Sequence, residues 1–170
     1  MPNEYGHVAG KNDIDRIDAR SLEILQRDGR RTYADIGTDV GISGPSAHER
    51  IKKLEARGVV SGYVATVDPS AVGRGILAFT WVTQAPGSSG TDLAVDFKAI
   101  PEIEECHYLA GEADYLLKIR ARDTKDLERV IRRLQAIRHV FSTETDIVFS
   151  SPFERRPIRL VGETDGAGGA

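Results

Sequence analysis

The fold is decided by the stretch Val40-Gly41-Ile42-Ser43-Gly44-Pro45-Ser46-Ala47-His48-Glu49-Arg50-Ile51-Lys52-Lys53-Leu54-Glu55-Ala56-Arg57. Ser43 is a residue type that caps helix starts, and a proline at position 45 is tolerated in a first helical turn. Gly58 can end the helix because glycine readily takes the left-handed conformation. The sequence therefore predicts a helix from about residue 44 to residue 57.

The two sides of this predicted helix differ in chemistry. At about 100° of rotation per residue, apolar side chains gather on one face and charged side chains on the other. The apolar face consists of Ala47, Ile51 and Leu54. The far side and the flank carry Glu49, Arg50, Lys52 and Lys53. The apolar face can pack against other helices, and the charged side can then meet a partner.

Two further helices precede this one. Asp15 or Asp18 can cap the first, which ends at Gly29. A second, short helix begins near Thr32 and stops at Gly41. Three helices, with a turn of about four residues between the last two, form the helix-turn-helix arrangement.

Gly37 separates this motif from an ordinary amphipathic helix. Taken alone, residues 50–57 also fit a solvated helix without a partner. A glycine inside a helix costs about 0.5–1 kcal/mol relative to alanine, and a close helix crossing is a reason to accept that cost. Gly41 and Ile42 then occupy the turn and core positions of the motif. The context therefore favours a helix-turn-helix.

The second half of the chain alternates strands with helices. The predicted order is an extended stretch at 59–67, a strand at 76–83, a helix at 91–100, strands at 103–109 and 115–121, a helix at 124–137 and a strand at 140–149. From residue 76 on, this is the βαββαβ order of a ferredoxin-like α+β fold, an antiparallel sheet covered on one face by two helices. The other face exposes apolar side chains unless a second subunit covers it.

The composition indicates a soluble globular protein. Of the 170 residues, 40% are hydrophobic and 29% are charged. No stretch reaches the roughly 18 apolar residues of a membrane-spanning helix, and the first residues lack a secretory signal pattern. Cys106 is the only cysteine, so no disulfide forms within the chain, as expected in the cytosol. With a net charge of -3, DNA binding requires a local cluster of positive charge.

The last helix of the motif supplies the expected DNA contacts. In this motif its N-terminal end enters the major groove, so residues there are the expected base readers. These are Pro45, Ser46, His48 and Glu49. Basic residues on the flank and further along are better placed for phosphates. These are Arg50, Lys52, Lys53 and Arg57.

From residue 14 to about residue 152 the sequence resembles the Lrp/AsnC family, the feast/famine regulators of transcription. The segments that carry the resemblance are Ile14-Asp15-Arg16-Ile17-Asp18, Leu25-Gln26-Arg27-Asp28-Gly29-Arg30, Val40-Gly41-Ile42-Ser43, Arg50-Ile51-Lys52-Lys53-Leu54-Glu55, Gly58-Val59-Val60-Ser61-Gly62-Tyr63, Cys106-His107-Tyr108-Leu109-Ala110-Gly111-Glu112-Ala113-Asp114-Tyr115-Leu116-Leu117 and Ser142-Thr143-Glu144-Thr145. The chain departs from the family at Gly37, where alanine is common, and at Gly44, His48 and Glu49. These departures concern the DNA sequence preference and leave the motif intact.

The resemblance implies a sequence-specific DNA-binding regulator of amino-acid metabolism that forms homodimers and often octamers. The ferredoxin-like part corresponds to the RAM domain, which senses amino acids, and the strand near Tyr63 usually pairs with its counterpart in the dimer. The effector usually lies between dimers. The residues expected at its site are Tyr108, Gly111, Glu112, Asp114, Thr143 and Thr145.

The expected domain division has five parts. These are a flexible N-terminus at 1–12, the helix-turn-helix domain at 13–62, a linker strand at 63–75, the RAM ligand-sensing and oligomerisation domain at 76–152, and a C-terminal tail at 153–170 whose end is expected to be disordered.

The expected effector site has the chemistry that an amino acid requires. Asp114 or Glu112 can accept hydrogen bonds from the ammonium group, while the hydroxyls of Thr143 and Thr145 and the backbone around Gly111 can donate to the carboxylate. The same residues also fit an ordinary hairpin turn followed by threonines that favour a strand. The residues alone leave both interpretations open, and the resemblance favours the effector site.

An enzyme is the main alternative class. Cys106 and His107 are neighbours in a predicted strand, so their side chains point to opposite faces and do not form a nucleophile and base pair. The histidines and carboxylates show no metal-ligand spacing, so neither a metal nor a cofactor is expected. Some proteins that resemble this family are haem-pathway decarboxylases acting on a tetrapyrrole, which would absorb in the Soret region. The complete basic helix favours a regulator over that enzyme, and over a sensory module without DNA binding.

Overall fold

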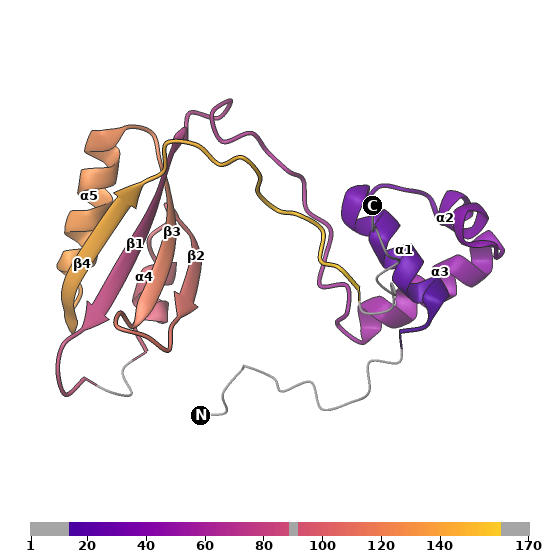
Figure 1. The fold of residues 1–170 in the computed structure, drawn as a ribbon, viewed down its shortest axis with the longest axis horizontal. Helices are drawn as coiled ribbons and strands as arrows, with labels where there is room; N and C mark the ends of the chain where they lie inside the picture. The colour runs from indigo at the N-terminus through magenta and orange to yellow at the C-terminus, as the bar shows by residue number, and fades with distance from the viewer. Residues whose placement is uncertain (1–13, 89–91, 161–170) are drawn as a thin grey trace, which may run out of the picture. The chain divides into compact units, whose positions relative to one another are not determined.

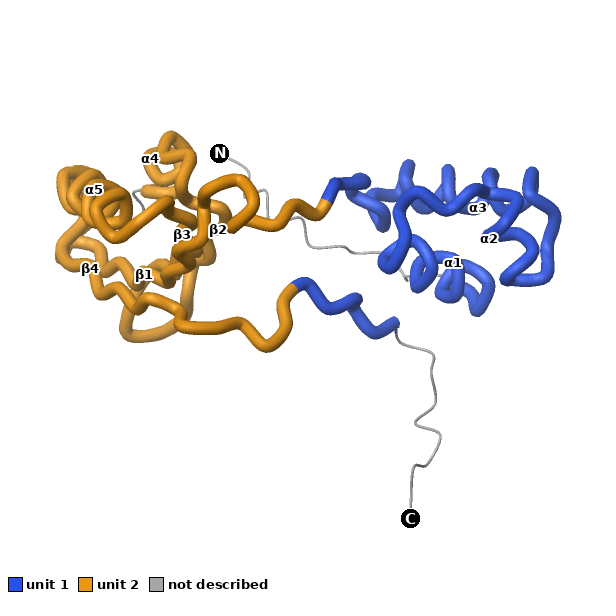
Figure 2. The backbone as a smooth tube through the Cα atoms, turned by 90° about the horizontal axis from the view of Figure 1, so that it is seen from above, with its two compact units in different colours: residues 1–65, 155–170 blue, residues 66–154 orange. Residues whose placement is uncertain are grey.

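The structure is a computed structural model that describes residues 14–88 and 92–160. The chain forms two compact units, one of residues 1–65 with 155–170 and one of residues 66–154 (Figure 2). The flexible N-terminus expected at 1–12 lies outside the described residues, as do the end of the tail and the predicted helix start at residue 91.

Within its described residues, the first unit contains three helices, α1 (Arg16–Arg27), α2 (Tyr33–Val40) and α3 (Gly44–Ala56), as Figure 1 shows. Each begins after a residue whose side chain accepts a hydrogen bond from a backbone N–H three positions on. The three capping residues are Asp15, Thr32 and Ser43. The predicted helix starts are therefore confirmed, and Asp15 is the cap of α1.

The packing of α2 on α3 holds this unit together. Ile36, Ala47 and Ile51 are fully buried in its core. A Cβ atom added at Gly37 would lie 2.8 Å from the carbonyl oxygen of Ile42, and one added at Gly44 would lie 3.2 Å from the Cα atom of Ala34. The backbones therefore touch, which confirms the close crossing expected from Gly37.

The described part of the second unit is a four-stranded antiparallel sheet with two helices. Its elements are β1 (Ile76–Gln84), α4 (Ala94–Lys98), β2 (Ile103–Tyr108), β3 (Tyr115–Ala121), α5 (Thr124–Gln135) and β4 (Val140–Ile147). The strand order is β2-β3-β1-β4, so the predicted ferredoxin-like order is confirmed. The helix α4 is shorter than predicted, and no side chain caps its start at Leu93.

The two faces of the sheet differ in what covers them. Figure 2 shows α4 and α5 on the same side, where Phe97, Leu117 and Val130 are fully buried. Along β1, side chains alternate between the faces, so Phe79 and Trp81 lie on the side without helices. Both are only partly buried. This is the face that was expected to need a second subunit.

The stretch 59–67, which the sequence predicts as extended, forms no strand in the described chain. A strand requires a neighbour that completes its backbone hydrogen bonds, and none is paired with it here. Its Tyr63 hydroxyl donates to Glu55 at 2.9 Å. Burial and this hydrogen bond raise the pKa of Tyr63 to about 12, so the side chain stays neutral.

Candidate DNA interface and effector site

The outer side of α3 presents the residues predicted to bind DNA. Ala47, Ile51 and Leu54 are buried, which confirms the predicted packing face. Exposed on the other side are Pro45, Ser46, His48, Glu49, Lys52, Lys53 and Arg57, with Arg50 half-buried. A hollow of about 310 Å³ is lined by Asp18, Ser46, Glu49, Arg50, Lys53, Leu54 and Arg57. The structure thus gathers five of the eight predicted residues around one hollow.

Arg50 is held by the start of α1. Its Nη1 atom lies 2.6 Å from Asp15 and 2.9 Å from Asp18. The hydrogen bonds to Asp18 and Asp15 raise the pKa of Arg50, while the backbone N–H of Asp18 and the Arg50 guanidinium lower the pKa of Asp15. Arg50 therefore joins α1 to α3, a role that the helical pattern of α3 does not reveal.

The other basic residues of α3 differ in how far their charge is neutralised. Lys52 forms an ion pair with Glu55 at 2.8 Å on the exposed surface, and this hydrogen bond raises the pKa of Lys52. Lys53 makes no ion pair within residues 14–88 and 92–160. Near the start of α3, the ring of His48 packs against Tyr33 with centroids 4.6 Å apart, which fixes one predicted base reader to α2.

Four of the six predicted effector residues lie at the β2–β3 hairpin. The Tyr108 ring is exposed and meets Tyr115 edge-on, with centroids 5.1 Å apart. Gly111 and Glu112 are also exposed. The Asp114 carboxylate is half-buried and accepts a hydrogen bond of 2.6 Å from the backbone N–H of Gln84. Asp114 thus ties the hairpin to the end of β1.

The two predicted threonines lie on β4, on the far side of β1 from the hairpin. Val82 of β1 pairs with Tyr115 on one side and with Thr143 on the other. Two strand spacings, about 10 Å, therefore separate the two halves of the predicted site. Thr143 accepts a hydrogen bond from the Gln135 amide at 2.9 Å, and the Thr145 hydroxyl bonds to Thr80 at 2.9 Å. The structure places both halves at one end of the sheet without joining them.

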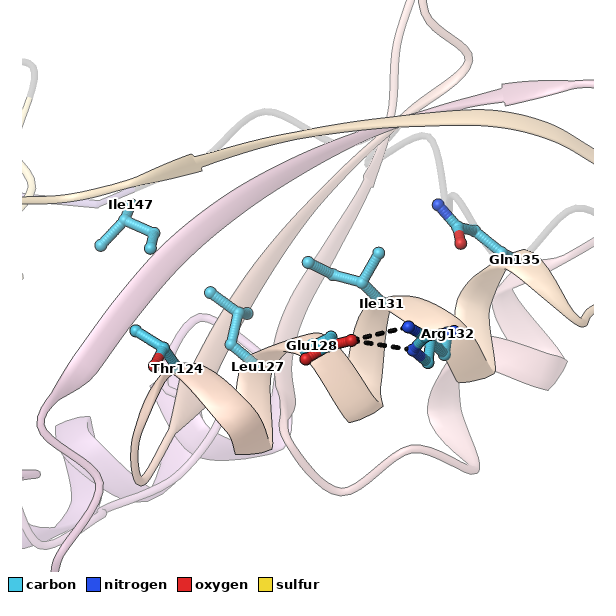
Figure 3. Close-up of a pocket in the computed structure, with 7 residues that line it drawn as sticks. All are labelled: Thr124, Leu127, Glu128, Ile131, Arg132, Gln135 and Ile147. Atoms are coloured by element: carbon cyan, nitrogen blue, oxygen red, sulfur yellow. Dashed lines mark hydrogen bonds and ion pairs between the residues drawn. The ribbon is translucent and has the colours of Figure 1, made fainter.

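A shallow hollow lies between β4 and α5, beside Thr143. Its volume is about 320 Å³, and its lining residues are Thr124, Leu127, Glu128, Ile131, Arg132, Gln135 and Ile147. Figure 3 shows Ile147, Leu127 and Ile131 pointing into the space between the strand and the helix. The sequence did not indicate this hollow, because it depends on how far β4 stands from α5. Apolar residues of α5 that face the edge strand are its only sequence signal.

The remaining reactive groups do not form a site among the described residues. Cys106 packs against the core, where burial raises the pKa of its thiol. His107 is exposed and lies 3.3 Å from Glu105, so the expected separation of the two side chains is confirmed. Within the described part of the chain, no group of His, Cys, Asp or Glu residues is arranged to hold a metal ion, and no helix is long and apolar enough to cross a membrane.

Both units match known protein domains. Residues 14–55 match the AsnC-type helix-turn-helix domain, and residues 77–158 match the Lrp/AsnC ligand binding domain. The chain belongs to the Lrp/AsnC family. The expectation from the sequence is therefore confirmed, and this Lrp/AsnC protein is a helix-turn-helix transcriptional regulator.

Its relatives include regulators and solved structures. It is 35% identical over 147 residues to the transcriptional regulator LrpA of Mycobacterium tuberculosis, covering 86% of this chain and 96% of that protein. A feast or famine regulatory protein of M. tuberculosis, solved with L-methionine, matches with a TM-score of 0.80 and 33% identity, covering 84% of this chain and 97% of that one. AsnC of E. coli matches with a TM-score of 0.79 and 27% identity, covering 86% and 99%.

Replacing Arg50 by alanine is expected to lower the stability of the helix-turn-helix unit by about 1 kcal/mol, because Asp15 and Asp18 both lose an ion partner. Because Arg50 helps to lower the pKa of Asp15 in the folded protein, the Asp15 part of this stabilisation is present above the ordinary carboxyl pKa and is lost as pH falls through the lowered one. Urea unfolding followed by circular dichroism should show a gap between the two proteins at pH 6 to 7 that narrows below about pH 4. Lys53→Ala is the control and should change stability little. A gap that widens in acid would contradict this role.

Proposed function

We propose that this regulator binds specific DNA sequences through α3, and that an amino acid or related small molecule bound to its second unit changes its DNA affinity or assembly. The observation that carries the proposal is the exposed polar and basic side of α3, next to a buried apolar side that fixes its position. The same chain carries a matching ligand-binding domain, and one similar structure was solved with L-methionine.

The charge distribution of the chain determines which residues can attract DNA phosphates. The whole chain has a net charge of -3, so attraction to phosphates comes from local groups such as Lys53 rather than from the whole molecule. Arg50 and Lys52 are already ion-paired with carboxylates of this chain. These pairs weaken the attraction of a single α3 helix for phosphates, and we propose that two copies bind together and gain affinity through multivalency.

The effector is proposed to bind at the hairpin that carries Tyr108, Gly111, Glu112 and Asp114. One oxygen of Asp114 holds the Gln84 N–H, and a carboxylate can accept further hydrogen bonds from an ammonium group. Thr143 and Thr145 lie too far across the sheet to complete the same pocket within one chain. We propose that they face an effector held at a neighbouring copy, as expected for a site between dimers.

The sheet face with Phe79 and Trp81 and the unpaired stretch 59–67 are proposed to meet their counterparts in a homodimer, which can assemble further into an octamer. We propose that the protein acts in the cytosol and is not an enzyme. The relatives are regulators, and a tetrapyrrole decarboxylase would have no need of the polar and basic side of α3.

Replacing both Lys52 and Lys53 by alanine tests the DNA interface. Binding should weaken on specific and non-specific duplexes alike, and the slope of log affinity against log salt should fall by about 0.9 for each DNA phosphate that is no longer neutralised. Fluorescence anisotropy of a labelled duplex measures both quantities. Lys98→Ala, on α4 of the other unit, is the matched control and should leave them unchanged. An unaltered slope in the double variant would show that α3 does not face DNA.

A thermal-shift screen with the twenty amino acids tests the effector site. A ligand present at 100 times its dissociation constant adds about 2.7 kcal/mol to stability, so an effector should raise the unfolding temperature. Asp114→Asn keeps an acceptor for the Gln84 N–H and removes the charge that an ammonium group needs. The variant should therefore fold normally and no longer respond. If it responds like the original protein, Asp114 is not part of the effector site.

A further inference from the structure

The C-terminal segment at residues 155–160 belongs to the helix-turn-helix unit, as the shared blue colour in Figure 2 shows. The side chain of Gln26, in the last turn of α1, both donates a hydrogen bond to the main chain of this segment and accepts one from it. The Gln26 amide nitrogen donates to the carbonyl oxygen of Ile158 at 3.1 Å, and the Ile158 N–H donates to the Gln26 side-chain oxygen at 2.6 Å. Two bonds of this kind also join paired strands. Both of these hydrogen bonds are made to the backbone of the segment, so they do not require a particular side chain at position 158.

The docked segment is strongly basic. Arginine stands at positions 155, 156 and 159, and residues 155–160 contain no acidic residue. All three arginines are exposed. Glu154, the nearest acid before the segment, is held in the other unit by Arg120 at 3.1 Å. A charge of +3 is therefore attached to the DNA-binding unit of a chain whose net charge is -3.

Further basic residues follow Gln26 in the sequence. Arg27 follows Gln26 directly, and Arg30 lies in the short connection after α1; both are exposed. The segment is thus a basic area of this unit, and Arg27 and Arg30 are close in the sequence to its docking residue Gln26. Such an area attracts a polyanion, and the polyanion that a helix-turn-helix unit meets is duplex DNA.

We infer that residues 155–160 form a basic arm of the DNA-binding unit, in which Arg155, Arg156 and Arg159 bind DNA phosphates outside the groove occupied by α3. This inference rests on the proposed function and adds a second DNA-binding region to it. Extended basic arms beside a recognition helix lie along the backbone or in the minor groove of DNA. The hydrogen bonds to Gln26 give the arm a fixed starting point, which lowers the entropy cost of its binding.

The triple variant Arg155→Gln, Arg156→Gln and Arg159→Gln tests the arm in the full chain. Gln26 binds the main chain of Ile158, which the three replacements leave unchanged. The salt slope of binding to a labelled duplex should fall by up to about 2.7, since each of the three phosphates bound by the arm contributes about 0.9. The matched control replaces the same three arginines by lysine, which keeps the charge and should keep the slope. An unchanged salt slope in the glutamine variant, or an equal fall in the lysine variant, would overturn the inference that the arm binds DNA phosphates.

The Gln26→Ala variant distinguishes the contribution of the docking to DNA affinity from that of the arginine charges. It releases the segment and leaves all three arginines in place, so affinity should fall several-fold while the salt slope stays close to that of the original protein. An unchanged affinity would overturn the docked arm. The Lys52 and Lys53 double variant, measured on the same duplex, separates the arm from the proposed function. If the double variant lowers the salt slope while the glutamine variant does not, the basic arm is wrong and the proposed function stands. If the original protein binds no duplex, both are wrong.

Discussion

The direct packing of the α2 backbone against the start of α3 is the constraint on which the DNA-binding unit depends. At Gly37 there is no room for a Cβ atom beside the carbonyl of Ile42, and Gly41 takes the left-handed conformation, with φ of 78°, that turns the chain between the helices. This close approach fixes the direction of α3. Once that direction is fixed, burial of Ala47 and Ile51 determines which side of α3 faces outward.

Positive charge in this chain is used for two different purposes. Arg50 is tied to Asp15 and Asp18 and stabilises the packing of α1 on α3. In the other unit, arginines surround the buried Asp126, where hydrogen bonds from Arg122 hold the carboxyl pKa well below its usual range. Charges that hold the fold in this way attract DNA less strongly. We therefore propose that exposed basic residues such as Lys53 and the arginines of the proposed C-terminal arm supply the attraction to DNA, which makes binding dependent on salt and on the number of copies.

The sequence predicted most of the fold because its signals are local. Helix caps at Asp15, Thr32 and Ser43 and the alternation along β1 act within a few residues, and they match the structure closely. Interactions between residues far apart in the sequence were not predicted. Examples are the clamp on Arg50 and the docking of Ile158 on Gln26, 132 positions apart. The stretch 59–67 was predicted as extended from its residue types, and forming a strand requires a neighbour that one chain does not supply.

The central claim is that α3, presented by a symmetric pair of copies, reads a specific DNA sequence. Selection of duplexes from a random pool by the full-length protein tests this most directly. We expect enrichment of a sequence with two related half-sites whose centres lie about 10–10.5 base pairs, or a multiple of that distance, apart. We further expect the enrichment to disappear when Ser46 and Glu49 are replaced by alanine. A pool that remains random, or an enriched site that survives those replacements, would contradict the claim.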